Sequence, residues 1–525
     1  MPKARRKPKK KATTSSATTD GETLISPGLD ILSLSPLNDV SPLLLDSAVT
    51  ADDKLPFKLP YVGPISLVQR PQSVVHGRGL VATRDVAAGE CLFVIPAVAS
   101  APIDKIYEQF LDDDGEDYDD IDDDIDSTNK ESSFVTKDGP HLESIAEAVL
   151  TEQIHALNDI LNNEESVAVD KKETVLQACN LLQAFVSQMS TDEVPSTTSS
   201  EELMHILLLL SGSTNMESAH RKDLDTDTIR NTIRRNSFGP DFHNYDTIAT
   251  CWNTNPDGKK FYNRMLGVYP LSAMINHSCS PNAVRIFGRI PDSNSENSEL
   301  CDQIQGREVM IVHANKSISK GSEISWSYIP PSNALYERRE SLMSKYGFTC
   351  NCTRCMQEEK ALIDNPLTTI TDYLPGNEAS MLNMIEKIEG HPFSNEIRVS
   401  YATLYLEYFN AALVRSDLDK INDVLKLATR LHFSFVACNN ACTEHLSILH
   451  MCYELAGVLH TNALKHKPEG AISQVRFWTE QLKRTHLVRY GNLGDNVDNV
   501  RALMKHSRVV LRKKEGWYSV NDKFI

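Results

Sequence analysis

The sequence predicts an α+β fold, with an irregular β-rich core, a helical insertion within that core and an all-helical C-terminal region. Three observations predict it: a strand–turn–strand pattern that occurs twice, helical spacing of apolar residues between the two occurrences, and helical spacing near the C-terminus. At 525 residues the chain has room for two to four domains and a sizeable core.

The strand pattern comes first at residues 79–95 and again at residues 309–328. In each case a β-type run is followed by a glycine-containing turn, at 87–90 and at 319–323, and then by a second β-type run. Two hairpins of this kind predict an irregular fold of short strands and not a parallel βαβ sheet. Gly77-Arg78-Gly79 lacks the third glycine and the helix of a dinucleotide site, so it is a plain turn or a close approach of backbone to ligand.

The helical segments differ in position and length. Apolar residues at helical spacing predict a helical insertion over 141–230, and similar periods recur in 397–409, 418–435, 443–465, 471–489 and 497–513. The later set predicts a bundle or a helical-repeat array. The histidines in this part are expected to be core or surface residues, because no clustered carboxylates accompany them.

We therefore expect seven segments. They are a disordered basic tail (1–56), the N-terminal part of the core (57–100), an acidic disordered linker (101–140), the helical insertion (141–230), the C-terminal part of the core (231–349), a short cysteine loop (350–357) and the helical C-terminal domain (358–525).

The charge distribution bears on partners and location. The formal net charge is −17, and a long acidic run at 112–126 contrasts with a basic run at 3–11. An acidic surface argues against direct nucleic-acid binding and favours a basic partner such as a lysine-rich peptide. The basic run is interpreted as a nuclear address, with an organelle transit peptide or a solubilising tail as alternatives, so nucleus and/or cytoplasm is expected. Apolar runs such as 206–210 are far too short to cross a membrane.

A polar cluster follows an apolar run at residues 267–282. Asn276, His277, Ser278 and Cys279 follow each other directly, and Pro281 disfavours helix just after them, so they leave a packed segment at a bend. Such a cluster is placed to touch a ligand or a metal; a plain loop with a buried thiol is the alternative.

Three further cysteines, Cys350, Cys352 and Cys355, have a spacing that aims three thiolates at one point. The chain has eleven cysteines and no secretory signal, which indicates reduced thiols, some of them metal ligands. Structural zinc needs four ligands, and Cys279 is the nearest thiol in sequence apart from Cys301 in a polar insert. A zinc ion would then hold the loop against the Asn-His bend; a redox role for the thiols is the alternative.

Six motifs in this order resemble the SET-domain protein lysine methyltransferases, and most closely the SET-and-MYND (SMYD) family. They are Gly77-Arg-Gly-Leu, Asn236-Ser-Phe, Gly267-Val-Tyr-Pro, Asn276-His-Ser-Cys-Ser-Pro-Asn, Gly321-Ser-Glu-Ile-Ser-Trp-Ser-Tyr and Tyr346-Gly-Phe-Thr-Cys-Asn-Cys-Thr-Arg-Cys. The resemblance is close over about 75–100 and 231–357 and holds only in type elsewhere.

The resemblance implies an S-adenosylmethionine-dependent protein-lysine N-methyltransferase acting on histone or non-histone lysines. It implies Tyr328 as the catalytic tyrosine and Tyr346 as the second tyrosine of the lysine channel. The residues it implies for cofactor binding are His76, Gly77, Arg78, Asn236, Asn276, His277, Tyr328 and Phe348. It implies one structural zinc ion on Cys279, Cys350, Cys352 and Cys355.

One departure from the family concerns the MYND zinc finger. Residues 101–178 contain no cysteine, so this finger is missing there and the acidic segment occupies its place. The resemblance also implies that the C-terminal helices form a tetratricopeptide-like domain over the substrate cleft, and we expect a monomer. Two alternatives remain: a non-catalytic adaptor that holds basic proteins on a SET scaffold, and a plastid-type SET enzyme, a type that lacks the cysteine loop.

Overall fold

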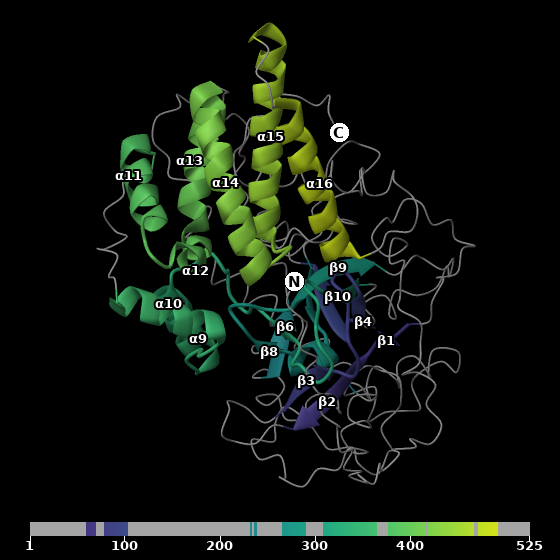
Figure 1. Cartoon of the computed structure of the whole chain (residues 1–525). Coiled ribbons are helices and arrows are strands. Elements are labelled where there is room, and N and C mark those ends of the chain that lie inside the picture. The colour runs from purple at the N-terminus through teal and green to yellow at the C-terminus, as the bar shows by residue number, and fades with distance from the viewer. Residues whose placement is uncertain are drawn as a thin grey trace, which may run out of the picture.

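The computed structural model describes residues 59–69, 78–102, 210, 232–233, 236–238, 265–289, 308–364, 376–415, 418–466 and 471–491. The predicted basic tail, the acidic run, the insertion apart from Leu210, the loop at 291–305 and the helix at 497–513 lie outside these residues. Within them the fold has mixed strand and helix content, with strands in one half and helices in the other (Figure 1).

The strand half consists of short strands in several small sheets. One sheet has the order β1-β4-β10-β9, one has β5-β7-β6, and two pairs are formed by β2 with β3 and by β8 with β11. The bounds are β1 Tyr61–Val62, β2 Ile65–Gln69, β3 Arg78–Ala82, β4 Cys91–Pro96, β5 Ala99–Pro102, β6 Ser237–Phe238, β7 Met265–Val268, β8 Asn276–His277, β9 Ala283–Arg289, β10 Glu308–Ala314 and β11 Ser325–Trp326.

The two predicted hairpins are wrong, although their strands and turns are present. Gly89 and Gly321 adopt φ of 85° and 78° in the turns, a conformation that favours glycine. However, β3 pairs with β2, and β4 pairs with β1 and β10. The two strand–turn–strand units pair with each other, through β4 with β10 and through a bridge between Val86 and Ile318. Alternating apolar residues predict a strand but not its partner, because the backbone groups that pair are the same in every strand.

The polar cluster of the sequence lies at the predicted bend. Pro270–Met274 forms the short 3₁₀ helix η4, which begins with proline, and most of its side chains are buried. Its C-cap Ile275 returns to an extended conformation, and β8 follows directly. The buried turn therefore fixes the direction in which Asn276 and His277 leave it.

The helical half begins after β11. Its helices are α9 Leu335–Tyr346, α10 Thr353–Asp364, α11 Glu378–Glu389, α12 Ser394–Ile397, η6 Arg398–Tyr401, α13 Ala402–Arg415, α14 Leu418–Cys438, α15 Thr443–His466 and α16 Ala471–Tyr490. Figure 1 shows α13, α14, α15 and α16 side by side as a layer, with α9 and α10 near one edge of the strand half. Helices α14, α15 and α16 occupy segments where apolar spacing predicts helix, whereas the run from Ile397 is divided among α12, η6 and α13.

The sheet containing β10 is buried on both faces. Val309 and Ile311 pack into the apolar core of the helices, while Met310 and Val312 pack into the core of the strand half. Successive side chains of a strand point to opposite faces, so a strand between two cores needs a continuous apolar run. This shared sheet joins the two halves, and α16 packs directly against β9 and β10.

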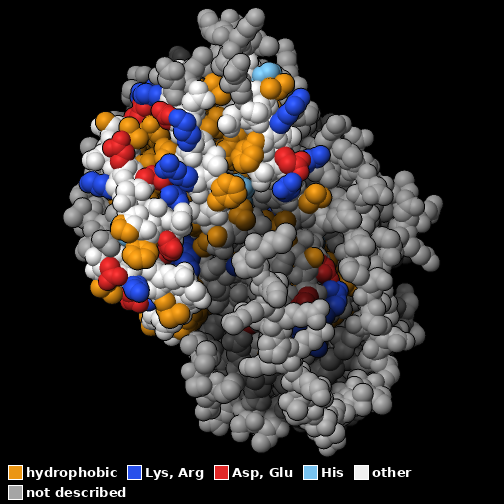
Figure 2. All heavy atoms as spheres, viewed as in Figure 1, with side chains coloured by type: hydrophobic (Ala, Val, Ile, Leu, Met, Phe, Trp, Pro, Cys, Tyr) orange, Lys and Arg blue, Asp and Glu red, His pale blue; other side chains and the backbone are white. Residues whose placement is uncertain are grey.

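The surface of the helical half is mixed in charge. On the face shown in Figure 2, basic and acidic side chains are interspersed with apolar ones over the helices. Among the described helices, none combines the length and the apolar character that crossing a membrane requires.

Candidate active site and metal centre

Asn276 joins three segments that are far apart in sequence. Its Nδ2 donates to the carbonyl oxygen of Arg78 and to Oε1 of Glu323, both at 2.9 Å. Gly79 permits this approach, because a Cβ there would lie 2.9 Å from the Asn276 amide nitrogen and 3.0 Å from the Glu323 carboxylate. The start of β3, the second glycine turn and β8 therefore meet at one polar point.

His277 lies between the candidate catalytic tyrosine and the cysteines. The backbone amide of Tyr328 donates to His277 Nδ1 at 3.0 Å. A backbone amide can only donate, so Nδ1 carries no proton and the neutral ring bears its proton on Nε2. That nitrogen lies 3.1 Å from the sulfur of Cys279 and donates to it.

Tyr328 ends the segment that β11 begins. Its hydroxyl donates to the carbonyl oxygen of Ile275 at 2.7 Å. Burial raises the pKa of Tyr328, and the nearby Tyr346 raises it further, so the phenol stays protonated at neutral pH. A protonated hydroxyl beside a backbone carbonyl, just before Asn276, is a fixed pair of oxygens at the bend.

Aromatic rings lie beside the ring of Tyr328. The ring of Tyr346 lies 4.9 Å from that of Tyr328, and the His277 ring lies 5.2 Å from Tyr328 and 5.9 Å from Phe348. Tyr346 is 39% exposed, whereas Phe348 is half-buried. The structure thus brings the two predicted tyrosines and Phe348 together, with Tyr346 on the solvent side.

Only some of the other predicted cofactor residues belong to the part of the chain that the structure describes. His76 and Gly77 lie outside the described residues. Arg78 begins β3, and burial lowers its pKa. Asn236 lies beside β6 and donates to the carbonyl of Thr232 at 2.9 Å. Because β6 pairs with β7, which leads into η4, Asn236 belongs to the same part of the strand half, but its described contact is not with Asn276 or His277.

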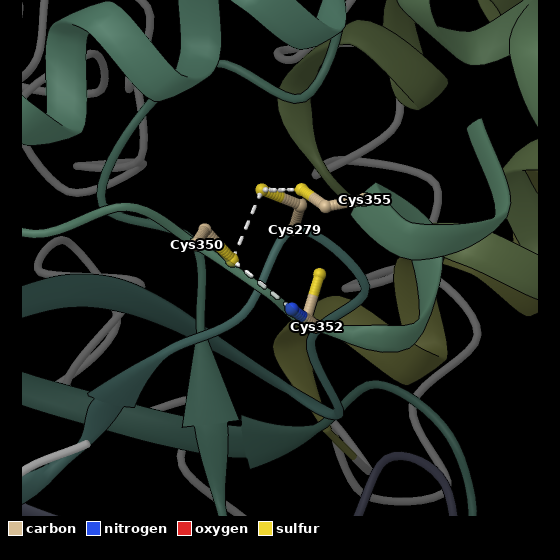
Figure 3. A group of neighbouring side chains, drawn as sticks. All are labelled: Cys279, Cys350, Cys352 and Cys355. Carbon is tan, nitrogen blue, oxygen red and sulfur yellow. Dashed lines mark hydrogen bonds between the residues drawn. The ribbon is translucent and has the colours of Figure 1, made fainter. Parts of the chain in front are cut away.

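The four predicted cysteines converge (Figure 3). The sulfurs of Cys279, Cys350, Cys352 and Cys355 all lie within 4.8 Å of one another. The Cys279 sulfur is 3.9 Å from that of Cys350 and 3.5 Å from that of Cys355. These distances are far too long for disulfides, which join sulfurs at about 2.05 Å.

The donor set fits zinc. A tetrahedral site with Zn–S bonds of about 2.3 Å places its sulfurs about 3.8 Å apart, close to the distances observed. Cys279 and Cys355 are fully buried, and the backbone amide of Cys352 points to the sulfur of Cys350 at 3.5 Å. Four thiol groups from two separate segments, one after β8 and one that runs into α10, therefore have the number and spacing that a closed, structural metal site requires.

Sequence reasoning missed several groups of this site. Glu323 binds Asn276, and Asn282 holds the second turn by donating to the Glu323 carbonyl at 2.7 Å and accepting from the Ser325 amide at 2.9 Å. Both residues lie within the six motifs given above, so the motifs could have indicated them. The Ile275 carbonyl has no sequence signal, because any residue type provides that oxygen.

Comparison with known proteins finds a family match that covers most of the strand half. Residues 77–329 match the family model of the SET domain. The chain therefore carries a SET domain, which contains Asn276, His277, Cys279 and Tyr328, while the cysteine loop follows it.

Its relatives include lysine methyltransferases. Histone-lysine N-methyltransferase ASHR1 of Arabidopsis thaliana is 35% identical over 106 residues, which are 19% of this chain and 18% of ASHR1. Histone-lysine N-methyltransferase SET5 of Saccharomyces cerevisiae is 31% identical over 118 residues, 22% of this chain and 18% of SET5. A SET and MYND domain-containing protein of Dictyostelium discoideum is 33% identical over 93 residues, 18% of this chain and 22% of that protein. The chain thus spans about a fifth of the length of these curated relatives.

A solved structure, that of the SET domain of LSMT bound to lysine and AdoHcy, is also similar. It is 10% identical, covering 83% of this chain and 93% of that one, with a TM-score of 0.23. At that TM-score the likeness carries no argument about this chain.

Proposed function

We propose that this chain is an S-adenosylmethionine-dependent protein-lysine N-methyltransferase with one structural zinc ion. The observation that carries the proposal is the placement of the Tyr328 hydroxyl. Within a SET domain, it is hydrogen-bonded to the carbonyl before Asn276 and His277, and the ring that carries it lies 4.9 Å from the ring of Tyr346. The relatives named histone-lysine N-methyltransferase support the same reaction.

The reaction requires a neutral amine. Lysine has a reference pKa of about 10.4, so removing its proton at pH ~7.4 costs roughly 4 kcal/mol. A cationic sulfonium nearby and an apolar channel both lower that pKa, the first by like-charge repulsion and the second by desolvation. The enzyme therefore needs alignment more than it needs a general base.

The residues present fit a sulfonium methyl donor with an adenosine and an amino-acid end. Arg78, Asn236 and Asn276 offer polar groups, and His277 and Phe348 offer ring faces, the first four from the SET domain and Phe348 from the segment after it. When bound, S-adenosylmethionine supplies an electrophilic methyl group. Its predicted contacts with His76 and Gly77 belong to the same proposal.

The oxygens of Tyr328 and Ile275 would align the reacting groups. Fixed oxygens can accept weak hydrogen bonds from a methyl group made acidic by a positive sulfur, and they can orient the lone pair of an amine. Their 2.7 Å separation is set by the fold before any substrate arrives. Tyr346, on the exposed side, would form the wall of the lysine channel and contact the cationic amine.

We further propose that zinc fixes the channel wall. The residues that would hold it are Cys279 beside β8 and Cys350, Cys352 and Cys355 after Tyr346 and Phe348. A metal shared by these two loops keeps the wall residues against the Asn-His bend.

For the substrate we propose a histone or another lysine-containing protein. We further propose that the enzyme acts as a monomer in the nucleus and/or cytoplasm, without a nucleic acid or membrane partner. The C-terminal helices are proposed to be a tetratricopeptide-like domain that covers the substrate cleft, with the segment boundaries expected from the sequence. A cavity of about 70 Å³ lies at the border of the two halves and is lined by residues of both, among them Arg285, Trp326, Glu444 and Arg489. The C-terminal helices thus reach the strand half beside Ser327 and Ile329, the neighbours of Tyr328.

Transfer of radiolabelled methyl groups tests the proposal. The purified chain is incubated with labelled S-adenosylmethionine and a panel of histones and cytosolic proteins, and mass spectrometry locates the labelled residue. Labelled lysine is expected. Calorimetry with S-adenosylmethionine completes the test: if the chain neither binds the donor nor labels a protein, the adaptor alternative replaces the enzyme.

A further inference from the structure

A buried charged network lies beside the cysteines, and the methyl-transfer step proposed above does not use it. It consists of Arg338 on α9, Arg354 and Glu358 on α10, and Ser400 in η6. Their exposed fractions are only 0%, 4%, 1% and 6%. Buried charges are costly unless they are paired and hydrogen-bonded, so a cluster of three needs an explanation.

Glu358 is the centre of the network. Oε2 accepts from Arg338 Nη2 at 2.6 Å, and Oε1 accepts from Arg354 Nε at 2.6 Å. The hydroxyl of Ser400 donates to the same Oε1 at 3.0 Å. One carboxylate thus holds two guanidinium groups and the hydroxyl of Ser400 in η6.

The two arginines extend the network to the cysteines. Arg338 Nη2 lies 3.8 Å from the sulfur of Cys355, and Arg354 Nη1 donates to the backbone carbonyl of Cys279 at 3.1 Å. Both guanidinium groups also donate to the Ser400 hydroxyl, at 2.9 Å from Arg338 and 2.8 Å from Arg354. The ligand loops and η6 are therefore connected by a continuous set of hydrogen bonds.

The charge of the network is not balanced internally. Two guanidinium groups and one carboxylate leave one positive charge in excess in a buried place. Four neutral thiols would leave that excess uncompensated, whereas zinc with four thiolates carries two negative charges in excess. The network is positive, and a zinc ion held by four thiolates is negative, so the two charges attract each other.

We propose that Arg338, Arg354, Glu358 and Ser400 form the hydrogen-bonded surroundings of the metal centre, which offset part of its negative charge and couple its occupancy to the packing of η6. This inference rests on the zinc site proposed above and not on methyl transfer. Arg338 and Arg354 are positioning residues, since they hold the ligand loops through one sulfur and one backbone carbonyl.

The chain offers a matched control in the adjacent pair. Arg339 and Glu359 follow Arg338 and Glu358 on the same two helices and are also joined by a 2.7 Å ion pair. Their side chains, however, are 21% and 45% exposed, so this pair is partly open to solvent. Ion pairs that are open to solvent contribute little to stability. Removing Arg339 therefore removes a charge and leaves the buried network intact.

The first experiment measures metal affinity in the full chain. Cobalt replaces zinc, and its thiolate-to-metal absorption band is titrated in Arg338→Met, Arg338→Lys and Arg339→Met. Arg338→Met is expected to bind cobalt about 10- to 100-fold more weakly, the loss typical of changes to residues around metal ligands, with partial rescue in Arg338→Lys. Arg339→Met is expected to bind cobalt as tightly as the wild-type protein does. Equal affinity in Arg338→Met and the unchanged chain overturns the inference.

Ser400→Ala keeps the experiment decisive if Arg338→Met does not fold. It removes only the hydroxyl that links both arginines to η6, and Ser344→Ala, at an exposed serine of α9, is its control. Zinc release to a chelator is expected to be several-fold faster in Ser400→Ala and unchanged in Ser344→Ala. An unchanged release rate in Ser400→Ala contradicts the coupling.

Hydrogen exchange tests the coupling from the metal side. Removing zinc from the unchanged chain is expected to speed amide exchange in residues 394–401, while the β2–β3 pair keeps its rate. No change in 394–401 overturns the inference. If the wild-type protein binds neither zinc nor cobalt, the proposed metal site itself is wrong. The other negative results would contradict only the role of the network.

Discussion

The Tyr328 backbone amide donates to His277 Nδ1 at 3.0 Å, and this contact decides which way the imidazole proton points. The Nε2 proton is directed at the Cys279 sulfur, 3.1 Å away. The candidate catalytic tyrosine and a candidate metal ligand are thus connected through one ring. Loosening the cysteine site is therefore expected to disturb the active-site tyrosine as well.

The first prediction concerns the Tyr328 hydroxyl. Tyr328→Phe removes the hydrogen bond to the Ile275 carbonyl while keeping the ring beside Tyr346. Methyl transfer is expected to fall about 100-fold or more, the size of effect seen when one oriented donor is removed. Zinc content and donor binding, measured by elemental analysis and calorimetry, should remain. Tyr336→Phe, at an exposed tyrosine of α9, is the control; unchanged turnover in Tyr328→Phe would remove this residue from the mechanism.

The second prediction concerns the metal ligands. Cys350→Ser leaves three thiolates, and because metal binding is coupled to folding, the variant is expected to lose zinc and become insoluble or protease-sensitive. Cys438→Ser is a close control, since Cys438 contacts the Cys279 carbonyl and is not among the four sulfurs. Elemental analysis and limited proteolysis provide the measurements. A Cys350→Ser protein that is stable without zinc contradicts the prediction.

The third prediction uses the close approach at Gly79. An alanine Cβ there would lie 2.9 Å from the Asn276 amide nitrogen and 3.0 Å from Glu323, so Asn276 must move. Gly79→Ala is expected to weaken S-adenosylmethionine binding about tenfold, equal to roughly 1.4 kcal/mol. Gly457→Ala is the control, because a Cβ in that helix meets nothing within 4 Å. Calorimetry that finds equal affinity for both variants would show that Asn276 does not hold the donor.

A chain of neutral histidines in the helical half leads to the fourth prediction. The Ala441 amide donates to His445 Nδ1, so His445 Nε2 donates to His432 Nδ1 at 2.8 Å, and His432 Nε2 donates to Gln481. Each of the two rings carries one proton, and all of their ring nitrogens form hydrogen bonds. Adding a proton to either ring breaks a hydrogen bond.

The expected consequence is a loss of stability in acid. Burial lowers the pKa of His432 to about 4, whereas an unfolded histidine has a pKa of about 6.5. Between these values the unfolded chain binds more protons, so the free energy of unfolding falls as pH decreases, by up to about 1.4 kcal/mol per pH unit for this group. Burial also lowers the pKa of His486 to about 4 and that of His313 to about 3, which adds to the effect.

Urea unfolding between pH 7.5 and 4.5 measures this effect. His432→Gln is expected to be less stable at pH 7.5 but to lose less stability on acidification than the unchanged chain. His460→Gln, at a partly exposed position of α15, is the control. A pH dependence that is identical in all three proteins would contradict the assignment to His432.

The sequence predicted the site better than it predicted the pairing of strands. Cys279 was assigned to the metal set by counting ligands, and its sulfur does lie with the other three. The bend after η4 followed from an apolar run and Pro281. The hairpins failed because alternation predicts which face of a strand is buried and does not specify the strand with which it pairs.

By itself the sequence determined the order of the motifs, the four candidate sulfur ligands and the helical periods of the C-terminal half, because these depend on residue type and spacing alone. Only the tertiary structure decided that Arg338 and Glu358 are buried while Arg339 and Glu359 are partly exposed. It also decided that the Ile275 carbonyl faces Tyr328. The reason is physical: the paired residues have the same side chains at neighbouring positions, and a backbone carbonyl has no side-chain identity, so their roles depend on which segments the fold brings against them.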